Sequence, residues 1–287
     1  MLLCNHLTIG YGAKVIQRDL TFSLRSGELV CMLGRNGCGK STLLRTLAGL
    51  QPPLDGTFQL GNSNHQSREV ALVLSSDEAI ESTTVHDVVA MGRYPYTSLL
   101  GKLSPADEQI IEDALAAVGF EFRKSPFKTL SNSPLKGENS SLPLREGQGG
   151  SKSPFKGDLE GLFDSPFMAH SDGEKQRILI AKALAQQTPI ILLDEPTAHL
   201  DLPNRIRVLQ LLRSLAHNEG KTILISTHEL DLATRLSDRI LLMTPQQGIQ
   251  LATPEELIAT DAFTQSFGIN PFDFSVEEKE KSTRNKV

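Results

Sequence analysis

Apolar and polar residues alternate from Leu3 to about Leu24. Leu20, Phe22 and Leu24, for example, are separated by single polar residues. A period of two places such side chains on one face of an extended strand, so the pattern predicts antiparallel strands with one apolar side. Tyr11 and Gly12 fall between two such stretches and are expected to form the turn that joins them.

Farther along, short runs of apolar residues have the length and composition of strands that are buried on both faces. These runs lie at Leu29–Leu33, Val70–Leu74, Ile190–Leu193 and Lys221–Ser226. Segments with helical spacing alternate with them, at Ser41–Leu50, Thr84–Met91, Ser104–Val118, Ser171–Leu184 and Asn204–Ala216. A short strand at Thr57–Leu60, a closing hairpin over 239–252 and a last helix from Pro254 complete the expected elements. Strands that alternate with helices in this way predict an α/β fold.

The stretch from Lys124 to about Gly161 differs in composition from the rest of the chain. It is rich in Ser, Pro, Gly and Lys, and Ser-Pro-Phe recurs at Ser125, Ser153 and Ser165. Its few aliphatic residues cannot bury enough apolar surface to offset the entropy of ordering it. We therefore predict a disordered insert at 124–161, with a docking segment built on the Ser-Pro motifs as the alternative. The charged residues 271–287 are predicted to form a flexible C-terminal tail.

Bulk composition narrows the class of protein. The chain has 287 residues, of which 39% are hydrophobic and 22% charged, as in ordinary globular domains. A formal net charge of −5 argues against broad electrostatic attraction to nucleic acid. The three cysteines lack the spacing of a disulfide framework or a zinc site, which favours a reducing compartment. No apolar run has the length of a membrane span and no signal-peptide pattern is recognised, so any membrane role is expected to be peripheral.

The most specific chemical signal lies between the first buried strand and the helix that follows it. Residues 34–42 are Gly-Arg-Asn-Gly-Cys-Gly-Lys-Ser-Thr and match the phosphate-binding pattern G-x-x-x-x-G-K-[ST] without a mismatch. The glycines let the backbone direct successive N–H groups at one phosphate, and the helix N-terminus adds partial positive charge. Lys40 can reach the β- and γ-phosphates, and Ser41 can bind Mg²⁺. The pattern predicts a nucleotide site formed by Gly34, Asn36, Gly37, Gly39, Lys40, Ser41 and Thr42.

Polar residues directly follow two of the later strands. Asp194 and Glu195 come after Ile190–Leu193, and His228 comes two residues after Ser226. Ligand chemistry in open α/β sheets concentrates at the carboxyl ends of the strands. We therefore expect Asp194 near Mg²⁺ and Glu195 near an attacking water. For His228 we favour contact with a γ-phosphate over a purely structural role.

Two further stretches have a structural explanation beside the functional one. Tyr11 could stack on a base, or it could simply pack against the turn in which it lies. Ser171-Asp172-Gly173-Glu174 has the Ser-x-x-Glu form of a capping box, which by itself indicates a well-capped helix. Neither stretch decides between its two explanations when taken alone.

In combination, the motifs resemble those of the ATP-binding subunits of ABC transporters, over the whole chain apart from the insert and the tail. Residues 34–42 match the Walker A motif, and residues 190–195 match Walker B with Glu195 as its catalytic glutamate. The resemblance implies ATP as substrate and Mg²⁺ held by Ser41 and Asp194. It also implies an α/β ATPase domain over residues 1–270, with an antiparallel β subdomain and a helical subdomain inserted at about 77–180.

The same resemblance implies roles for residues outside the two Walker motifs. Tyr11 matches the aromatic residue that stacks on adenine, Asp201 lies in the D-loop, and His228 is the switch histidine. Ser171-Asp172-Gly173-Glu174 stands where the signature sequence of the family contacts the ATP of a partner subunit.

The chain departs from the family pattern in two motifs. Ser75 stands where the family has the glutamine of the Q-loop, and serine is too short to make the same contact directly. The signature has Asp172 and Glu174 in place of glycine and glutamine. A carboxylate at Asp172 should weaken the closure of two subunits around ATP unless it points away.

Residues 84–96 are similar to the importers of iron-siderophore, haem and cobalamin type. This implies that ATP hydrolysis energises uptake of a metal chelate, with a second copy of the chain as a homodimer and polytopic permease subunits as partners. A periplasmic binding protein takes part indirectly, nucleic acid is not a partner, and the expected place is the cytoplasmic face of a bacterial inner membrane. The alternatives are a soluble ABC ATPase of translation or DNA repair, and a regulatory subunit that binds ATP without turnover.

Overall fold

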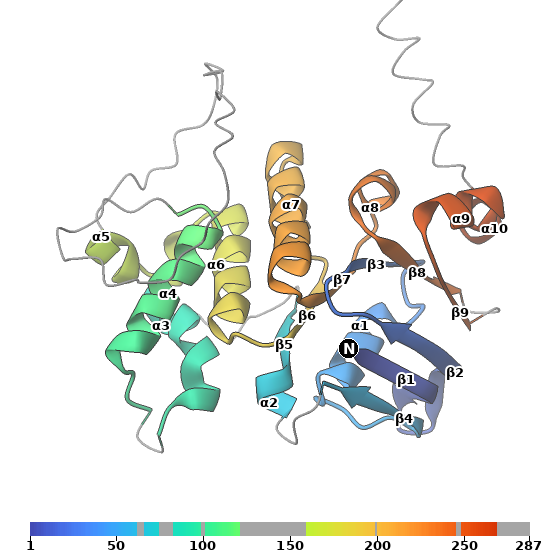
Figure 1. Ribbon diagram of the computed structural model, residues 1–287, viewed down its shortest axis with the longest axis horizontal. Helices are drawn as coiled ribbons and strands as arrows, with labels where there is room; N and C mark the ends of the chain where they lie inside the picture. Colours follow the sequence, from blue (N-terminus) through green and yellow to red (C-terminus); the bar gives the residue numbers. More distant parts are fainter. Residues whose placement is uncertain are drawn as a thin grey trace, which may run out of the picture.

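The computed structural model describes residues 1–61, 66–74, 83–98, 101–120, 159–198, 200–244 and 248–268. These residues form two β-sheets and helices that lie around and beside them (Figure 1). Ser75, most of the predicted insert and the predicted tail fall outside the described residues.

The smaller sheet is antiparallel and is formed mainly from the start of the chain. Its order is β2-β1-β4, with β1 at Leu2–Tyr11, β2 at Lys14–Leu24 and β4 at Asp55–Leu60. The alternating residues Leu20, Phe22 and Leu24 are all buried. The predicted strands are therefore confirmed, whereas Tyr11 itself ends β1 and the turn begins at Gly12.

The larger sheet has the order β5-β6-β7-β3-β8-β9 and is parallel except for β9. Its strands are β3 (Leu29–Gly34), β5 (Val70–Val73), β6 (Ile190–Asp194), β7 (Thr222–Ser226), β8 (Arg239–Thr244) and β9 (Gly248–Ala252). Every residue of β3, β6 and β7 is buried, as the apolar runs predicted. Ser226 is in register with both Met32 and Asp194, so these three strands end at the same edge of the sheet.

Helices cover both faces of the larger sheet. Helix α1 (Lys40–Leu47) packs between the two sheets, where Leu43, Leu44 and Leu47 share a core with β1, β2 and β3. Helix α7 (Leu202–Glu219) packs on the opposite face with α8 (Leu230–Leu236). Short helices α2 (Gln66–Glu69), α9 (Pro254–Ala259) and α10 (Ala262–Phe267) complete this part of the chain. No helix among the described residues is both long enough and apolar enough to cross a membrane.

The remaining helices form a group on one side of the larger sheet, at the left of Figure 1. They are α3 (Val85–Ala90), the 3₁₀ segment η2 (Met91–Tyr96), α4 (Pro105–Ala117), α5 (Leu159–Phe163), the 3₁₀ segment η3 (Phe167–Ala169) and α6 (Asp172–Ala185). Helices α3, α4 and α6 begin with capping boxes whose two reciprocal hydrogen bonds are both formed.

Among the boundaries that differ from the sequence-based expectations, two have a clear physical reason. Helix α5 begins before the predicted end of the insert at 161, because Leu162 is buried and the Phe163 ring lies 5.0 Å from the His86 ring. Helix α7 begins before the predicted Asn204, because the side chain of Asp201 caps it by accepting a hydrogen bond from the Asn204 N–H.

Candidate nucleotide-binding and catalytic site

The loop between β3 and α1 is shaped by its glycines. Gly39 precedes α1 with a φ of 109°, and a Cβ atom at this position would lie 2.8 Å from Ile16 Cγ2. Inside the loop, the Cys38 N–H donates to the Arg35 carbonyl over 3.2 Å. No side chain among the described residues caps α1, so the N–H groups of its first turn remain available for a ligand. This is the local geometry that a phosphate group requires.

Three side chains predicted for the nucleotide site lie at this loop. Lys40 is buried, and its Nζ donates to the Gly34 carbonyl over 2.8 Å. The hydroxyl of Thr42 donates to the Tyr11 hydroxyl over 3.4 Å, while Tyr11 keeps 48% of its surface exposed. Ser41 is exposed in the first turn of α1. The fold thus brings the aromatic residue of the β1–β2 turn to the phosphate-binding loop.

Gln17 supports the loop from β2 and was not anticipated from the sequence. Its side chain is buried, and its amide nitrogen donates to the Cys38 carbonyl over 3.0 Å and to the Thr244 carbonyl over 3.3 Å. The register that places Gln17 opposite Ile9 makes it a polar side chain inside an apolar interface. The polar character of Gln17 at a buried position can be recognised only after β1 and β2 have been paired.

Asp194 is the last residue of β6 and is buried at the edge where β3 and β7 also end. The hydroxyl of Ser226 donates to Asp194 Oδ1 over 2.5 Å. Ser226 thereby joins the end of β7 to the end of β6. A carboxylate at this edge and the Ser41 hydroxyl at the start of α1 are oxygen ligands of the kind that Mg²⁺ prefers.

Glu195 and His228 contact each other, because β6 and β7 are neighbours in the sheet and each residue follows the end of its strand. His228 Nε2 lies 2.7 Å from Glu195 Oε1, and the two side chains are 42% and 35% exposed. The Glu195 N–H donates to the Ser226 hydroxyl over 2.9 Å. Glu195 has a φ of 52°, in the left-handed region that non-glycine residues rarely adopt. The pair is accessible to a ligand and is held in a strained turn.

The segment Ser171–Glu174 forms the start of α6. Glu174 Oε2 accepts from the Ser171 N–H over 3.1 Å and from its hydroxyl over 2.9 Å. Asp172 is 74% exposed, and its carboxylate lies 3.6 Å from Lys175 Nζ. Asp172 therefore takes no part in the cap and has a cation beside it.

His170 precedes this segment and is buried, with Nε2 2.8 Å from the Ser165 hydroxyl. Burial lowers the pKa of His170, and the nearby Glu174 carboxylate opposes this shift. The histidine therefore joins the start of α6 to the segment that follows α5.

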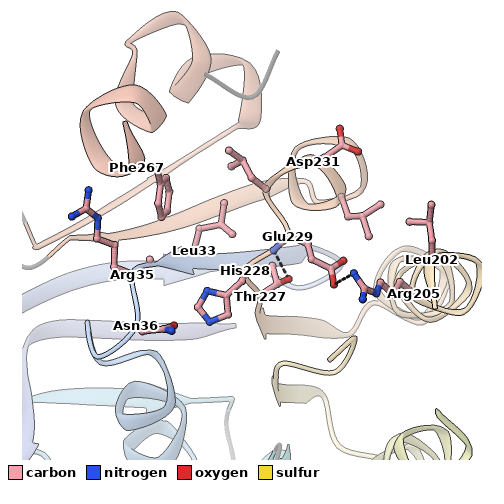
Figure 2. Close-up of a pocket in the computed structure, with 13 residues that line it drawn as sticks. Leu33, Arg35, Asn36, Leu202, Arg205, Thr227, His228, Glu229, Asp231 and Phe267 are labelled. Carbon is pink, nitrogen blue, oxygen red and sulfur yellow. Dashed lines mark hydrogen bonds and ion pairs between the residues drawn. The ribbon is translucent and has the colours of Figure 1, made fainter. Parts of the chain in front are cut away.

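A cavity of about 620 Å³ adjoins the phosphate-binding loop and the His228 segment. Figure 2 shows Arg35 and Asn36 on one side of it and Leu202 and Arg205 on the other, with Phe267 above Leu33. Arg35 Nε donates to the Ser266 carbonyl over 3.0 Å, which connects the loop to the end of α10. Residues 227–232 line the cavity between these two sides.

Comparisons with known proteins agree on one family. The family model described as ABC transporter matches residues 17–138 and 157–198. The petrobactin import ATP-binding protein FpuD of Bacillus anthracis is 35% identical over 260 residues, which cover 88% of this chain and 81% of the relative. The iron(3+)-hydroxamate import ATP-binding protein FhuC of Bacillus subtilis (strain 168) is 32% identical over 277 residues, covering 94% and 88%.

A solved structure extends this similarity to the fold. It is an inward-facing ABC transporter described as of metal-chelate type, and its matching chain is 27% identical with a TM-score of 0.72. The match covers 94% of this chain and 89% of that chain.

Proposed function

The chain belongs to the ABC transporter family as an ATP-hydrolysing, ATP-binding subunit of the importer branch, and from this premise we propose that it energises uptake of a metal chelate. The chelate is an iron-siderophore, haem or cobalamin. The observation that carries the hydrolysis part of the proposal is the contact of Glu195 with His228 at the sheet edge where the phosphate-binding loop begins. The two relatives named for petrobactin and hydroxamate import support the chelate class.

ATP binding is assigned to the loop at residues 34–42. The uncapped N-terminus of α1 supplies N–H donors, and the two positive-φ glycines Gly37 and Gly39 let the backbone approach the phosphates. Lys40 would exchange its bond to the Gly34 carbonyl for the β- and γ-phosphates. We propose that the exposed ring of Tyr11 stacks on the base.

The residues present also fit Mg²⁺. Ser41 offers a hydroxyl at the start of α1, and Asp194 offers a buried carboxylate whose orientation is held by Ser226. When bound, the ion would neutralise charge that develops on the phosphates. The donor set is composed of oxygen atoms throughout, which suits this hard cation.

For the hydrolysis step, Glu195 is proposed to orient and polarise the attacking water. His228 lies 2.7 Å from the Glu195 carboxylate, so it can hold that side chain and also contact the γ-phosphate. The hydrogen bond from the Glu195 N–H to Ser226 fixes the backbone beneath the carboxylate. The two side chains therefore act as a preorganised pair.

We further propose that two copies close around two ATP molecules beneath a polytopic permease, at the cytoplasmic face of the inner membrane. A periplasmic protein would deliver the chelate. In each copy the segment Ser171–Glu174 would face the ATP of the other copy, and Asp201 would lie in the contact between copies. The ion pair of Asp172 with Lys175 reduces the repulsion that its carboxylate would exert on the γ-phosphate.

The variant Glu195→Gln tests the catalytic assignment. It should retain ATP binding, measured with a fluorescent ATP analogue, and lose hydrolysis by orders of magnitude because the water is no longer polarised. Glu219→Gln is a matched control, since it makes the same change at an exposed carboxylate that pairs with Lys221 and does not line the cavity. Hydrolysis by Glu195→Gln at the wild-type rate would show that Glu195 lacks this role.

A second experiment tests the partners. Affinity purification of the tagged chain from detergent-solubilised membranes of the host should recover a permease in equal amounts. Recovery of ribosomal or DNA-bound partners instead would favour a soluble ABC ATPase. ATP binding without turnover, even with the permease present, would favour the regulatory alternative.

A further inference from the structure

A second connection joins the two catalytic segments at a distance from the Glu195–His228 contact. Figure 2 shows His228 directed toward Asn36, whereas Glu229, the next residue, is directed toward Arg205 on α7. Arg205 Nη1 lies 2.9 Å from Glu229 Oε1. Two successive residues of this segment therefore make contacts in different directions, His228 with Glu195 and Glu229 with Arg205.

Arg205 and Glu229 also hold the segment that follows Glu195. Arg205 Nε donates to the Leu200 carbonyl over 2.6 Å, and the Thr197 hydroxyl donates to Glu229 Oε1 over 3.4 Å. Thr197 lies two residues after Glu195, and Leu200 lies five residues after it. The Arg205–Glu229 ion pair thus contacts both the segment that follows Glu195 and the segment that follows His228.

Two backbone hydrogen bonds lie within the turn after Glu195, among those of its residues that the structure describes. The Ala198 N–H donates to the Glu195 carbonyl over 3.1 Å, and the Leu200 N–H donates to the Thr197 carbonyl over 3.3 Å. Glu195 is in the left-handed region, which is strained for a non-glycine residue and persists only where surrounding contacts enforce it. Arg205 and Glu229 supply contacts of this kind from α7 and from the segment after β7.

The Arg205–Glu229 pair is partly buried, so the charge of Arg205 helps to keep the Glu229 carboxylate ionised. Glu229 and Arg205 are 23% and 35% exposed. Burial raises the pKa of Glu229, and the Arg205 charge opposes this shift. Within the described residues, Glu229 Oε2 is buried without a hydrogen-bond partner, so the carboxylate is held through Oε1 alone. Loss of Arg205 would therefore release the Glu229 side chain.

We propose that Arg205 and Glu229 are positioning residues that set the spacing of Glu195 and His228 for ATP hydrolysis. The inference rests on the proposed function of those two residues. The ion pair touches neither the phosphate-binding loop nor Lys40, so its loss should leave nucleotide binding in place. Loss of the ion pair should displace the Glu195 carboxylate relative to His228. The rate of hydrolysis is highly sensitive to such a displacement.

The test uses the full chain in three variants, Arg205→Gln, Glu229→Gln and the double variant. The measurements are kcat and KM for Mg²⁺-ATP, the Kd for a fluorescent ATP analogue, and the melting temperature. We expect kcat to fall about tenfold or more in each variant while KM and Kd stay within about twofold. The kcat of the double variant should be no lower than that of the less active single variant, because the two residues act as one unit.

The matched control is Arg235→Gln, which removes the exposed Arg235–Asp231 pair in α8, 2.8 Å long, and should leave kcat unchanged. If Glu229→Gln does not fold, Glu229→Asp keeps the charge but shortens its reach, and an intermediate kcat is expected. Single variants with kcat within twofold of wild type would overturn the inference. So would a double variant whose loss equals the product of the two single losses, or a fall in kcat that only follows the folded fraction.

Glu195→Gln is assayed in parallel, so that failure of the positioning role can be distinguished from failure of the proposed catalytic role of Glu195. If Glu195→Gln hydrolyses ATP at the wild-type rate, the proposed function fails. If Glu195→Gln is inactive while Arg205→Gln and Glu229→Gln turn over normally, only the positioning inference fails.

Discussion

A buried ion pair within the helical group offers the most direct test of how that group is held together. Arg93 Nε lies 2.8 Å from Asp107 Oδ1, and the two side chains are only 6% and 12% exposed. Arg93 also donates to the Ala185 carbonyl over 2.7 Å and to Gln187 Oε1 over 3.0 Å. The guanidinium therefore joins η2, α4 and the end of α6, the helix that begins with Ser171–Glu174.

The substitution Asp107→Asn keeps the shape of the side chain but leaves the Arg93 charge buried without a counter-charge. Removing one partner of a buried pair typically costs about 3–5 kcal/mol, whereas an exposed pair contributes about 0–1 kcal/mol. In a chain of this size 1 kcal/mol corresponds to about 2–4 °C of melting temperature, so Asp107→Asn should melt about 10 °C lower. Asp231→Asn, in the exposed pair with Arg235, should shift melting by no more than about 3 °C.

The same pair predicts a pH dependence with a definite sign. Hydrogen bonds from the Ser104 hydroxyl and N–H, together with Arg93, lower the pKa of Asp107 to about 2. Because this value lies below the ordinary pKa of aspartate, near 3.9, the stabilisation is complete above about pH 4 and is lost as the pH falls toward 2. Melting curves followed by circular dichroism at several pH values measure both effects. Equal shifts for Asp107→Asn and Asp231→Asn at neutral pH would refute the reasoning.

Two further substitutions test the site. Gln17→Leu removes the amide that holds the Cys38 carbonyl, and a buried acceptor left unpaired costs about 1–3 kcal/mol. The Kd for a fluorescent ATP analogue should therefore rise about tenfold, and an unchanged Kd would contradict a role for Gln17 at the loop. Burial lowers the pKa of His170, so the unfolded chain takes up the proton first and stability falls as the pH drops below about 6.5. Between about pH 7.5 and 5.5, the melting temperature of His170→Gln should fall less than that of wild type. Equal decreases would exclude the titration of His170 as the cause.

Much of the secondary structure could be predicted because its signals are local. Thr84, Ser104 and Ser171 begin helices through contacts with residues three positions ahead, and those contacts depend on no other part of the chain. Short helices such as α8 and α10 were not predicted. Helices of this length are not stable alone and form because Leu232 and Phe263 are buried against the rest of the molecule.

The sequence by itself also determined the chemistry of the phosphate-binding loop, since the spacing of Gly34, Gly39 and Lys40 is a property of one continuous segment. Only the tertiary structure decided which distant residues support it. The strand order β6-β7-β3 brings Glu195 and His228 together, and strand pairing brings Gln17 beneath Cys38. Contacts of this kind join residues far apart in the chain, so they follow from sheet order, register and helix packing, which no local pattern encodes.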